Sequence, residues 1–235
     1  MMMTMQAIAG PGDNVAYISP VWPNIVEAVR ICGATPRPVS LDATPEGGWR
    51  LDLQKLFASC DARTRGIFVA SPGNPTGWMM DAAEIAELLA FCRRRRIWLV
   101  VDAVYERLTY GTARAPSPLD VAEPEDPVIS LNSFSKAWAM TGWRLGWIVA
   151  PPALMEAIAK LNEKDAKEFA EKLAEGPRPA EMAATIRMAG KRRSLATPKS
   201  STKSAPVQGT TPTATASHVP APLFFFSSAE QARQS

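Results

Sequence analysis

Ile97-Trp-Leu-Val-Val101 and the aspartate that follows it, Asp102, predict a buried strand of a parallel sheet. The run is short, continuous and apolar, which is typical of a strand covered on both faces. Asp102 then stands at the carboxyl end of that strand, where open α/β sheets bind their ligands. An aspartate that caps a helix or closes a turn is the simpler interpretation of the same position.

Short apolar runs of this kind recur along the first 150 residues and alternate with helical segments. We predict strands at residues 15–18, 37–41, 66–70, 97–101, 128–132 and 145–150. We predict helices at residues 1–8, 23–32, 52–59, 81–95 and 153–160. Asp81 is the expected N-cap of the fourth helix, with Glu84 at the capping-box position. The alternation predicts an α/β fold built on a mainly parallel, doubly wound sheet.

Ser71-Pro-Gly-Asn-Pro-Thr-Gly77 comes directly after the predicted strand at 66–70. Two prolines and two glycines in this heptapeptide predict a rigid loop at the strand end. Asn74 in the loop offers both a hydrogen-bond donor and an acceptor. The composition is also that of an ordinary turn. The position of the loop, one strand–helix unit before Asp102, favours a role in a binding site.

Ser133-Phe-Ser-Lys136 follows the predicted strand at 128–132, and Arg144 comes eight residues after the lysine. Lys136 stands among small and apolar residues, which predicts partial desolvation and therefore the neutral amine that imine chemistry needs. Ser133 and Arg144 supply a hydroxyl and a fixed positive charge, which suit a phosphate ester. A lysine imine beside a phosphate anchor is what pyridoxal 5'-phosphate (PLP) requires.

Two other interpretations of the lysine segment compete with this one. Ser-x-x-Lys also begins the acylation site of penicillin-binding proteins and serine β-lactamases, but their Ser-Asp-Asn or Tyr-x-Asn and Lys-Thr/Ser-Gly elements do not occur in this sequence. A serine-rich turn with an incidental lysine would have no chemical role. The only histidine, His218, lies in a polar tail, which excludes His-dependent triads and histidine-rich metal sites in the core. We therefore expect no metal site and favour lysine-centred chemistry.

Trp22 follows the predicted strand at 15–18 and can stack on a planar ring, although packing in the core is the simpler interpretation. Taken in order, Trp22, Asn74-Pro-Thr-Gly77, Asp102-x-x-Tyr105 and Ser133-x-Ser-Lys136 with Arg144 resemble the signature of class I/II aminotransferases of PLP fold type I. The resemblance covers about residues 1–162.

The resemblance implies a role for each matching residue. Lys136 resembles the lysine that binds PLP and carries the proton between substrate and cofactor, and Asp102 resembles the carboxylate that keeps the pyridine nitrogen protonated. Asn74 and Tyr105 match the groups that bind the oxygen of the ring. The other matches are Ser133 and Arg144 as phosphate ligands, Ser135 as a further one, and Trp22 as the stacking aromatic.

The resemblance implies an aminotransferase that acts on an amino acid and a 2-oxo acid, as a homodimer if it is complete. PLP-dependent lyases share this site, and a PLP-binding remnant without turnover is a further alternative. We expect a chain truncated at both ends, because the family's phosphate-binding loop and its small domain have no counterpart in this sequence. The amino donor and acceptor are not specified by these motifs.

Composition changes after the first domain. We predict a PLP-binding portion at 1–162, a charged helical stretch at 163–176 and a disordered, low-complexity tail at 177–235. The basic residues of the tail stand among Ser, Thr and Pro, so a solvated segment is favoured over a nucleic-acid partner. Three cysteines without metal spacing predict buried thiols in a reducing compartment. Without a signal peptide or an apolar run of about 18 residues, we expect a cytoplasmic protein without a membrane partner.

Overall fold

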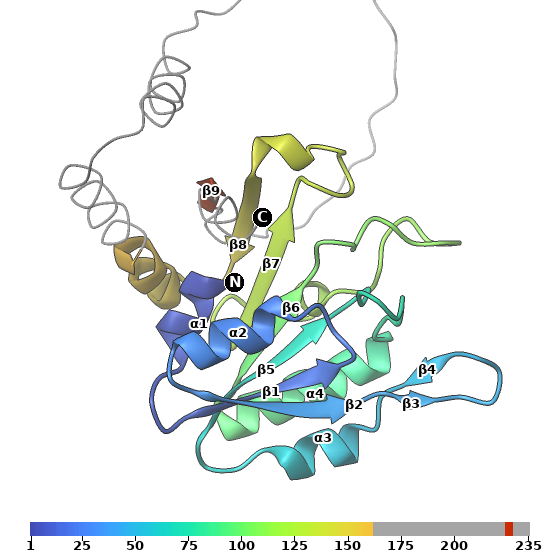
Figure 1. Ribbon diagram of the computed structural model, residues 1–235, viewed down its shortest axis with the longest axis horizontal. Helices are drawn as coiled ribbons and strands as arrows, with labels where there is room; N and C mark the ends of the chain where they lie inside the picture. The colour runs from blue at the N-terminus through green and yellow to red at the C-terminus, as the bar shows by residue number, and fades with distance from the viewer. Residues whose placement is uncertain (162–223, 228–235) are drawn as a thin grey trace, which may run out of the picture. The chain divides into compact units, whose positions relative to one another are not determined.

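A computed structural model describes residues 1–161 and 224–227. Its main sheet has the strand order β2-β1-β5-β6-β7-β8-β9 (Figure 1). The strands are β1 (Asn14–Ser19), β2 (Thr35–Ser40), β5 (Thr64–Ala70), β6 (Trp98–Asp102), β7 (Val128–Ser133), β8 (Leu145–Val149) and β9 (Phe224–Ser227). The first five of these strands run parallel, whereas β8 is antiparallel to β7 and β9 is antiparallel to β8. The sheet is therefore mainly parallel, as predicted.

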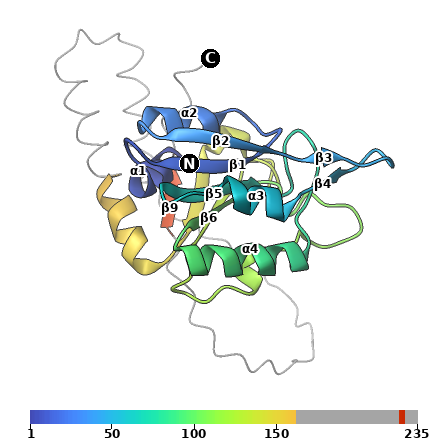
Figure 2. The same ribbon diagram turned by 90° about the horizontal axis from the view of Figure 1, so that it is seen from below.

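Helices cover both faces of this sheet (Figure 2). They are α1 (Met2–Ile8), α2 (Asn24–Ile31), α3 (Leu53–Ser59), α4 (Ala82–Arg95) and a helix at 152–161, with short 3-10 turns η1 (Pro118–Asp120) and η2 (Thr141–Trp143). Helices α1 and α2 lie on one face and α4 on the other. This two-sided covering confirms the doubly wound architecture.

The two faces of each central strand contribute to two separate cores. Phe68 and Val100 pack with α1, α2 and the helix at 152–161. Ile67, Val69 and Leu99 point the other way and pack with α3 and α4. Because both faces are buried, polar and apolar residues do not alternate along these strands. This explains the continuous apolar runs of the sequence.

Helix α4 begins as the sequence predicts. The side chain of Asp81 accepts a hydrogen bond from the amide of Glu84 at 2.8 Å, and the Glu84 carboxylate accepts one from the amide of Asp81 at 2.9 Å. This reciprocal capping box satisfies two amide donors of the first turn. At the other end, Arg93 forms a two-point ion pair with Asp126, which ties α4 to the segment before β7.

Several boundaries differ from the prediction. Strand β2 begins at Thr35 because Pro36 and Pro38 are tolerated in an edge strand, where one side of the backbone has no partner in the sheet. A hairpin of β3 (Asp42–Ala43) and β4 (Trp49–Arg50) was not expected, because strands of two residues are too short to show a periodic pattern of apolar residues.

The remaining predictions concern the end of the chain and the thiols. The helical stretch predicted at 163–176 lies outside the described residues, as does the tail predicted at 177–235 apart from β9, where no strand was expected. Cys60 and Cys92 are buried, Cys32 is half-buried, and all three are free thiols. Among the described residues, no helix has the length and apolarity needed to cross a bilayer.

Candidate active site

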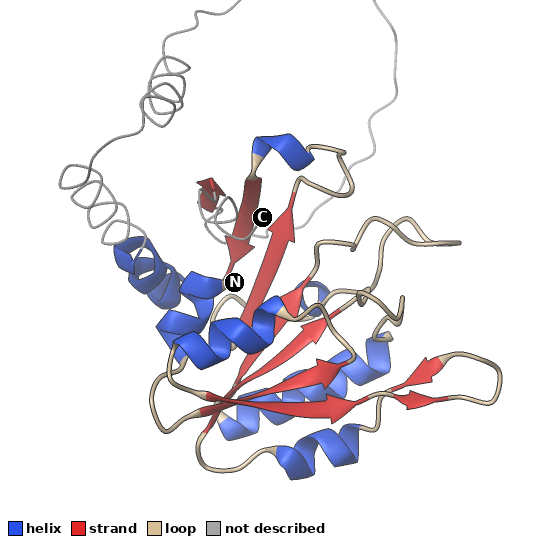
Figure 3. Cartoon of the chain, viewed as in Figure 1, coloured by secondary structure: helices blue, strands red, loops and turns tan. Residues whose placement is uncertain are grey.

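The candidate residues are brought together by the parallel strands, whose carboxyl ends meet at one edge of the sheet (Figure 3). Strands β5, β6 and β7 are neighbours in the sheet; Asn74 follows the first, Asp102 ends the second and Ser133 ends the third. Strand β8 runs in the opposite direction, so Arg144, the residue before it, lies at the same edge. Residues far apart in the sequence therefore converge on this edge.

Asp102 is placed by both neighbouring strands. Its backbone pairs with Ala70 of β5 and with Leu131 of β7. Its carboxylate accepts a hydrogen bond from the amide of Val104 at 3.1 Å. Burial raises the pKa of Asp102, and the bond from Val104 lowers it by less, so the net shift is upward. A partly buried carboxylate of this kind is suited to a cationic partner.

The loop 71–77 is held against the end of β6. The amide of Ser71 donates to the carbonyl oxygen of Asp102 at 3.2 Å, and the buried hydroxyl of Ser71 accepts from the amide of Met80 at 3.0 Å. The amide of Gly77 donates to the carbonyl of Gly73 at 2.7 Å, which closes the loop. Asn74 lies half-buried inside this closed loop, next to the strand that ends in Asp102.

The lysine lies in a turn at 134–138 that joins β7 to η2 and β8. Ser133 organises this turn, because its hydroxyl accepts from the amide of Ser135 at 3.0 Å and donates to the carbonyl of Leu145 at 3.4 Å. Lys136 itself is exposed. The prediction of a partly desolvated lysine is therefore wrong for the described residues, because the turn projects beyond the strand ends (Figure 1).

Lys136 meets Tyr105 at this edge. The Nζ atom of Lys136 lies 5.8 Å from the centroid of the Tyr105 ring, within the range of a cation–π contact. Tyr105 comes from the loop after β6 and Lys136 from the turn after β7, so the contact joins the ends of two neighbouring strands. Two of the predicted site residues thus lie side by side.

Arg144 is held in an unusual backbone conformation. Its φ angle is 53°, in the left-handed region, and that of Ala139 is 52°. Non-glycine residues adopt this region rarely, and such strain is concentrated at functional sites. The guanidinium of Arg144 donates to the carbonyl of Thr141 at 3.0 Å. Ser133 and Arg144 thus make hydrogen bonds within their own turns, and their predicted role as phosphate ligands stays a prediction.

Trp22 does not pack in the core. Its side chain is 58% exposed, so the simpler interpretation of this tryptophan is wrong. Trp22 follows β1, which is separated from β6 by β5 alone. Among the described residues, no hydrogen bond or ring contact joins Trp22 or Asn74 to Lys136. The structure therefore places these two residues at the same edge without joining them to the lysine.

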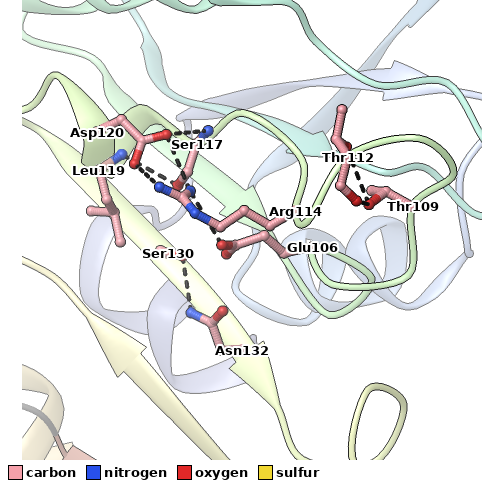
Figure 4. A network of polar contacts seen from close by, with 9 residues as sticks. All are labelled: Glu106, Thr109, Thr112, Arg114, Ser117, Leu119, Asp120, Ser130 and Asn132. Atoms are coloured by element: carbon pink, nitrogen blue, oxygen red, sulfur yellow. Dashed lines mark hydrogen bonds and ion pairs between the residues drawn. The ribbon is translucent and has the colours of Figure 1, made fainter. Parts of the chain in front are cut away.

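Two features of the site were not predicted. Gly146 lies opposite Ser133 in the β7–β8 pair, where a Cβ would come within 2.5 Å of the Asn132 carbonyl oxygen. The glycine at the end of Gly142-Trp-Arg-Leu-Gly146 was the available signal. Arg114 forms an ion-pair network with Glu106 and Asp120 (Figure 4), and no sequence pattern indicates it.

Comparison with known proteins identifies the family. The family model "Aminotransferase class I and II" matches residues 2–164. Aspartate aminotransferase of Rhizobium meliloti is 39% identical over 163 residues, which are 68% of this chain and 39% of that protein. A probable aspartate/prephenate aminotransferase of Aquifex aeolicus is 33% identical over 165 residues, 70% of this chain and 41% of that protein.

A solved structure gives the same result. Thermus thermophilus aspartate aminotransferase with maleate superposes with a TM-score of 0.64 at 33% identity, over 70% of this chain and 42% of that one. The chain thus spans about two fifths of the length of the relatives that it matches. The sequence, the doubly wound sheet and the motifs at its carboxyl edge agree, and the chain belongs to the class I and II aminotransferases, the PLP-dependent family that its motifs resemble.

Proposed function

We propose that this chain forms the PLP-binding part of an aminotransferase that transfers an amino group between an amino acid and a 2-oxo acid. The observation that carries the proposal is the contact between Lys136 and Tyr105, made on the strand end next to Asp102. PLP, when bound, supplies an aldehyde for a lysine amine and a pyridine ring that accepts electrons from the substrate.

The donor set of this edge fits such a group. Burial raises the pKa of Asp102 and so disfavours its charge, which a protonated ring nitrogen would compensate. Lys136 is exposed at the same edge, so its amine is accessible to an aldehyde. The residues present therefore offer an amine and a carboxylate from neighbouring strands.

Each residue would take the part that the resemblance to the family implies. With PLP bound, Lys136 would take a proton from the substrate Cα and return it, and Asp102 would hold the ring nitrogen in its protonated form. The remaining residues would bind and orient the cofactor: Asn74 and Tyr105 its ring oxygen, Ser133, Ser135 and Arg144 its phosphate, and Trp22 the face of its ring.

Borohydride trapping tests the proposal. The full chain is incubated with PLP, reduced with borohydride, digested and analysed by mass spectrometry. We expect the PLP adduct on the peptide that contains Lys136, and no adduct in Lys136→Ala. Lys160→Ala is the matched control and should be labelled like the wild type. An adduct on another lysine, or none, would contradict the proposal.

Product analysis then decides which reaction follows. A 2-oxo acid that appears together with an aminated acceptor indicates transfer, whereas ammonia and a shortened product indicate a lyase of the same fold. Binding of PLP without either product indicates a protein that binds the cofactor without turnover. All three outcomes use the same amine, so only the products separate them.

We also propose a cytoplasmic homodimer. Free Cys32, Cys60 and Cys92 support a reducing compartment, and the family suggests the dimer. Light scattering after gel filtration measures the oligomeric state. The charged helical stretch at 163–176 and the disordered tail at 177–235 stay predictions, and limited proteolysis tests them.

A further inference from the structure

Two cation–π contacts run in opposite directions between the loop after β6 and the turn after β7. The Lys136 ammonium of the turn lies 5.8 Å from the ring centroid of Tyr105 in the loop. The Arg107 guanidinium of the loop lies 5.9 Å from the Trp138 ring of the turn. Both distances are within the approximately 6 Å over which such contacts attract. The two segments are therefore joined at Lys136 and again two residues after it, at Trp138.

The turn that carries Lys136 is held on one side by aromatic packing. Trp138 is tilted against Phe134, with ring centroids 5.3 Å apart, and meets the edge of Trp147 of β8 at 5.7 Å. These contacts fix the turn to its own hairpin. Trp138 is still 44% exposed, and the face toward the loop is where Arg107 lies over its ring.

The loop, in contrast, is closed by its own polar contacts (Figure 4), and its residues Ala115 and Ser117 are buried in the domain. Arg114 makes a two-point ion pair with Asp120, and its Nη1 atom also lies 3.4 Å from the carboxylate of Glu106. The amide of Ala115 donates to the carbonyl of Glu106 at 2.8 Å. Arg107 follows Glu106 directly, so its backbone leaves from this bonded part of the loop.

We propose that Arg107 is a positioning residue for Lys136. Its guanidinium, held by the loop, lies over Trp138 and keeps the turn against the loop, so that the Lys136 amine stays beside Tyr105. An arginine suits this role because its planar group stacks on aromatic rings and does not lose its charge. The inference rests on the proposed function only in taking Lys136 as the amine that reacts with PLP.

The test compares Arg107→Gln, Trp138→Leu and the double variant in the full chain. Arg94→Gln is the matched control, because Arg94 is an exposed arginine of α4 for which no ion pair or ring contact is found among the described residues. Amide hydrogen exchange of 134–140 is measured without cofactor, and the PLP dissociation constant and the rate of borohydride-trapped adduct formation are measured with it.

We expect the amides of the turn to exchange faster in Arg107→Gln than in the wild type. We also expect this variant to bind PLP about two- to fivefold more weakly, which is the size of effect expected from an exposed cation–π contact. Arg107→Lys, which keeps the cation, should recover part of both effects. The double variant should be no weaker than the more affected single variant, because both substitutions remove the same contact.

The inference is overturned if Arg107→Gln matches Arg94→Gln in both exchange and PLP affinity, or if the two single effects add fully in the double variant. Absence of a Lys136 adduct in the wild type is a different result and contradicts the proposed function. Even then, the exchange rates without cofactor decide whether Arg107 holds the turn.

Discussion

Gly146 and Asn132 approach each other so closely that no side chain fits between them. A Cβ on Gly146 would lie 2.5 Å from the carbonyl oxygen of Asn132, a backbone atom that cannot rotate away. Gly146→Ala must therefore push β8 away from β7 next to Ser133. We expect a loss of about 1–3 kcal/mol in the free energy of unfolding, as for an overpacked core. Urea denaturation followed by circular dichroism measures it.

Gly142→Ala is the control for this substitution. A Cβ on Gly142 meets nothing within 4 Å, so the urea midpoint should stay close to that of the wild type. Equal losses in the two variants would mean that the strand spacing at Gly146 does not limit stability. The PLP adduct of Gly146→Ala should also form more slowly, because β7 and β8 frame the turn of Lys136.

Asp102→Asn is expected to stabilise the protein without cofactor and to weaken its binding of PLP. Burial raises the pKa of Asp102, so the folded state prefers the neutral carboxyl, and stability is lost as the pH rises from the unfolded pKa through the folded one. An uncharged asparagine removes that loss and can still accept the bond from Val104. At pH 7 we therefore expect a higher urea midpoint for the variant than for the wild type.

Two measurements on the Asp102 variant decide between a structural and a functional carboxylate. Urea midpoints without PLP report stability, and a spectroscopic titration reports the affinity for PLP. A variant that is less stable without cofactor would show that the charged carboxylate is needed for folding. A variant with unchanged PLP affinity would show that Asp102 does not face the ring nitrogen.

Ser71→Ala should destabilise the loop that carries Asn74. The Ser71 hydroxyl is buried and accepts from the amide of Met80 at 3.0 Å, so its removal leaves that amide without an acceptor. The expected cost is about 1–3 kcal/mol in the urea-derived free energy of unfolding. Ser40→Ala is the comparison, because Ser40 is exposed and its hydroxyl meets that of Ser19 at the surface. If Ser71→Ala and Ser40→Ala lower the free energy of unfolding equally, burial does not make the Ser71 hydrogen bond more stabilising than an exposed one.

The parallel core of the fold could be predicted because each central strand is covered on both faces. Val100 faces one core and Leu99 the other, so β6 appears in the sequence as an unbroken apolar run. The edge strand β2 was harder to predict from the sequence. Pro36 and Pro38 concealed the start of β2, since proline is normally evidence against a strand and is acceptable here only because the strand is at the edge.

The site was predictable where it depends on strand ends and not where it depends on packing between distant segments. Asp102 and Asn74 follow apolar runs, so their edge of the sheet follows from the topology alone. The exposure of Lys136 depends on how far its turn projects, which local composition does not determine. The contact of Arg107 with Trp138 joins two loops that are separate in the sequence, and no periodic pattern marks either residue.

Acid should destabilise the protein partly by protonating Asp126 and thereby breaking its ion pair with Arg93. The hydrogen bond from Arg93 lowers the pKa of Asp126, and the hydrogen bond from Asn14 lowers the pKa of Asp61 to about 2. A carboxyl whose folded pKa is depressed adds stability above its unfolded pKa of about 3.9, and this stability is lost as the pH falls toward the folded value. We therefore expect urea midpoints that fall below about pH 4.

Asp126→Asn isolates the contribution of one pair. The variant should be less stable than the wild type at pH 7 by about 0.5–1 kcal/mol, because Arg93 is partly exposed and solvent screens the pair. The difference should shrink as the pH falls toward 3, where the wild-type carboxyl becomes protonated as well. Glu125→Gln removes a neighbouring exposed carboxylate and should cost little at any pH. A deficit of Asp126→Asn that stays constant from pH 7 to pH 3 would mean that the ion pair is not its cause.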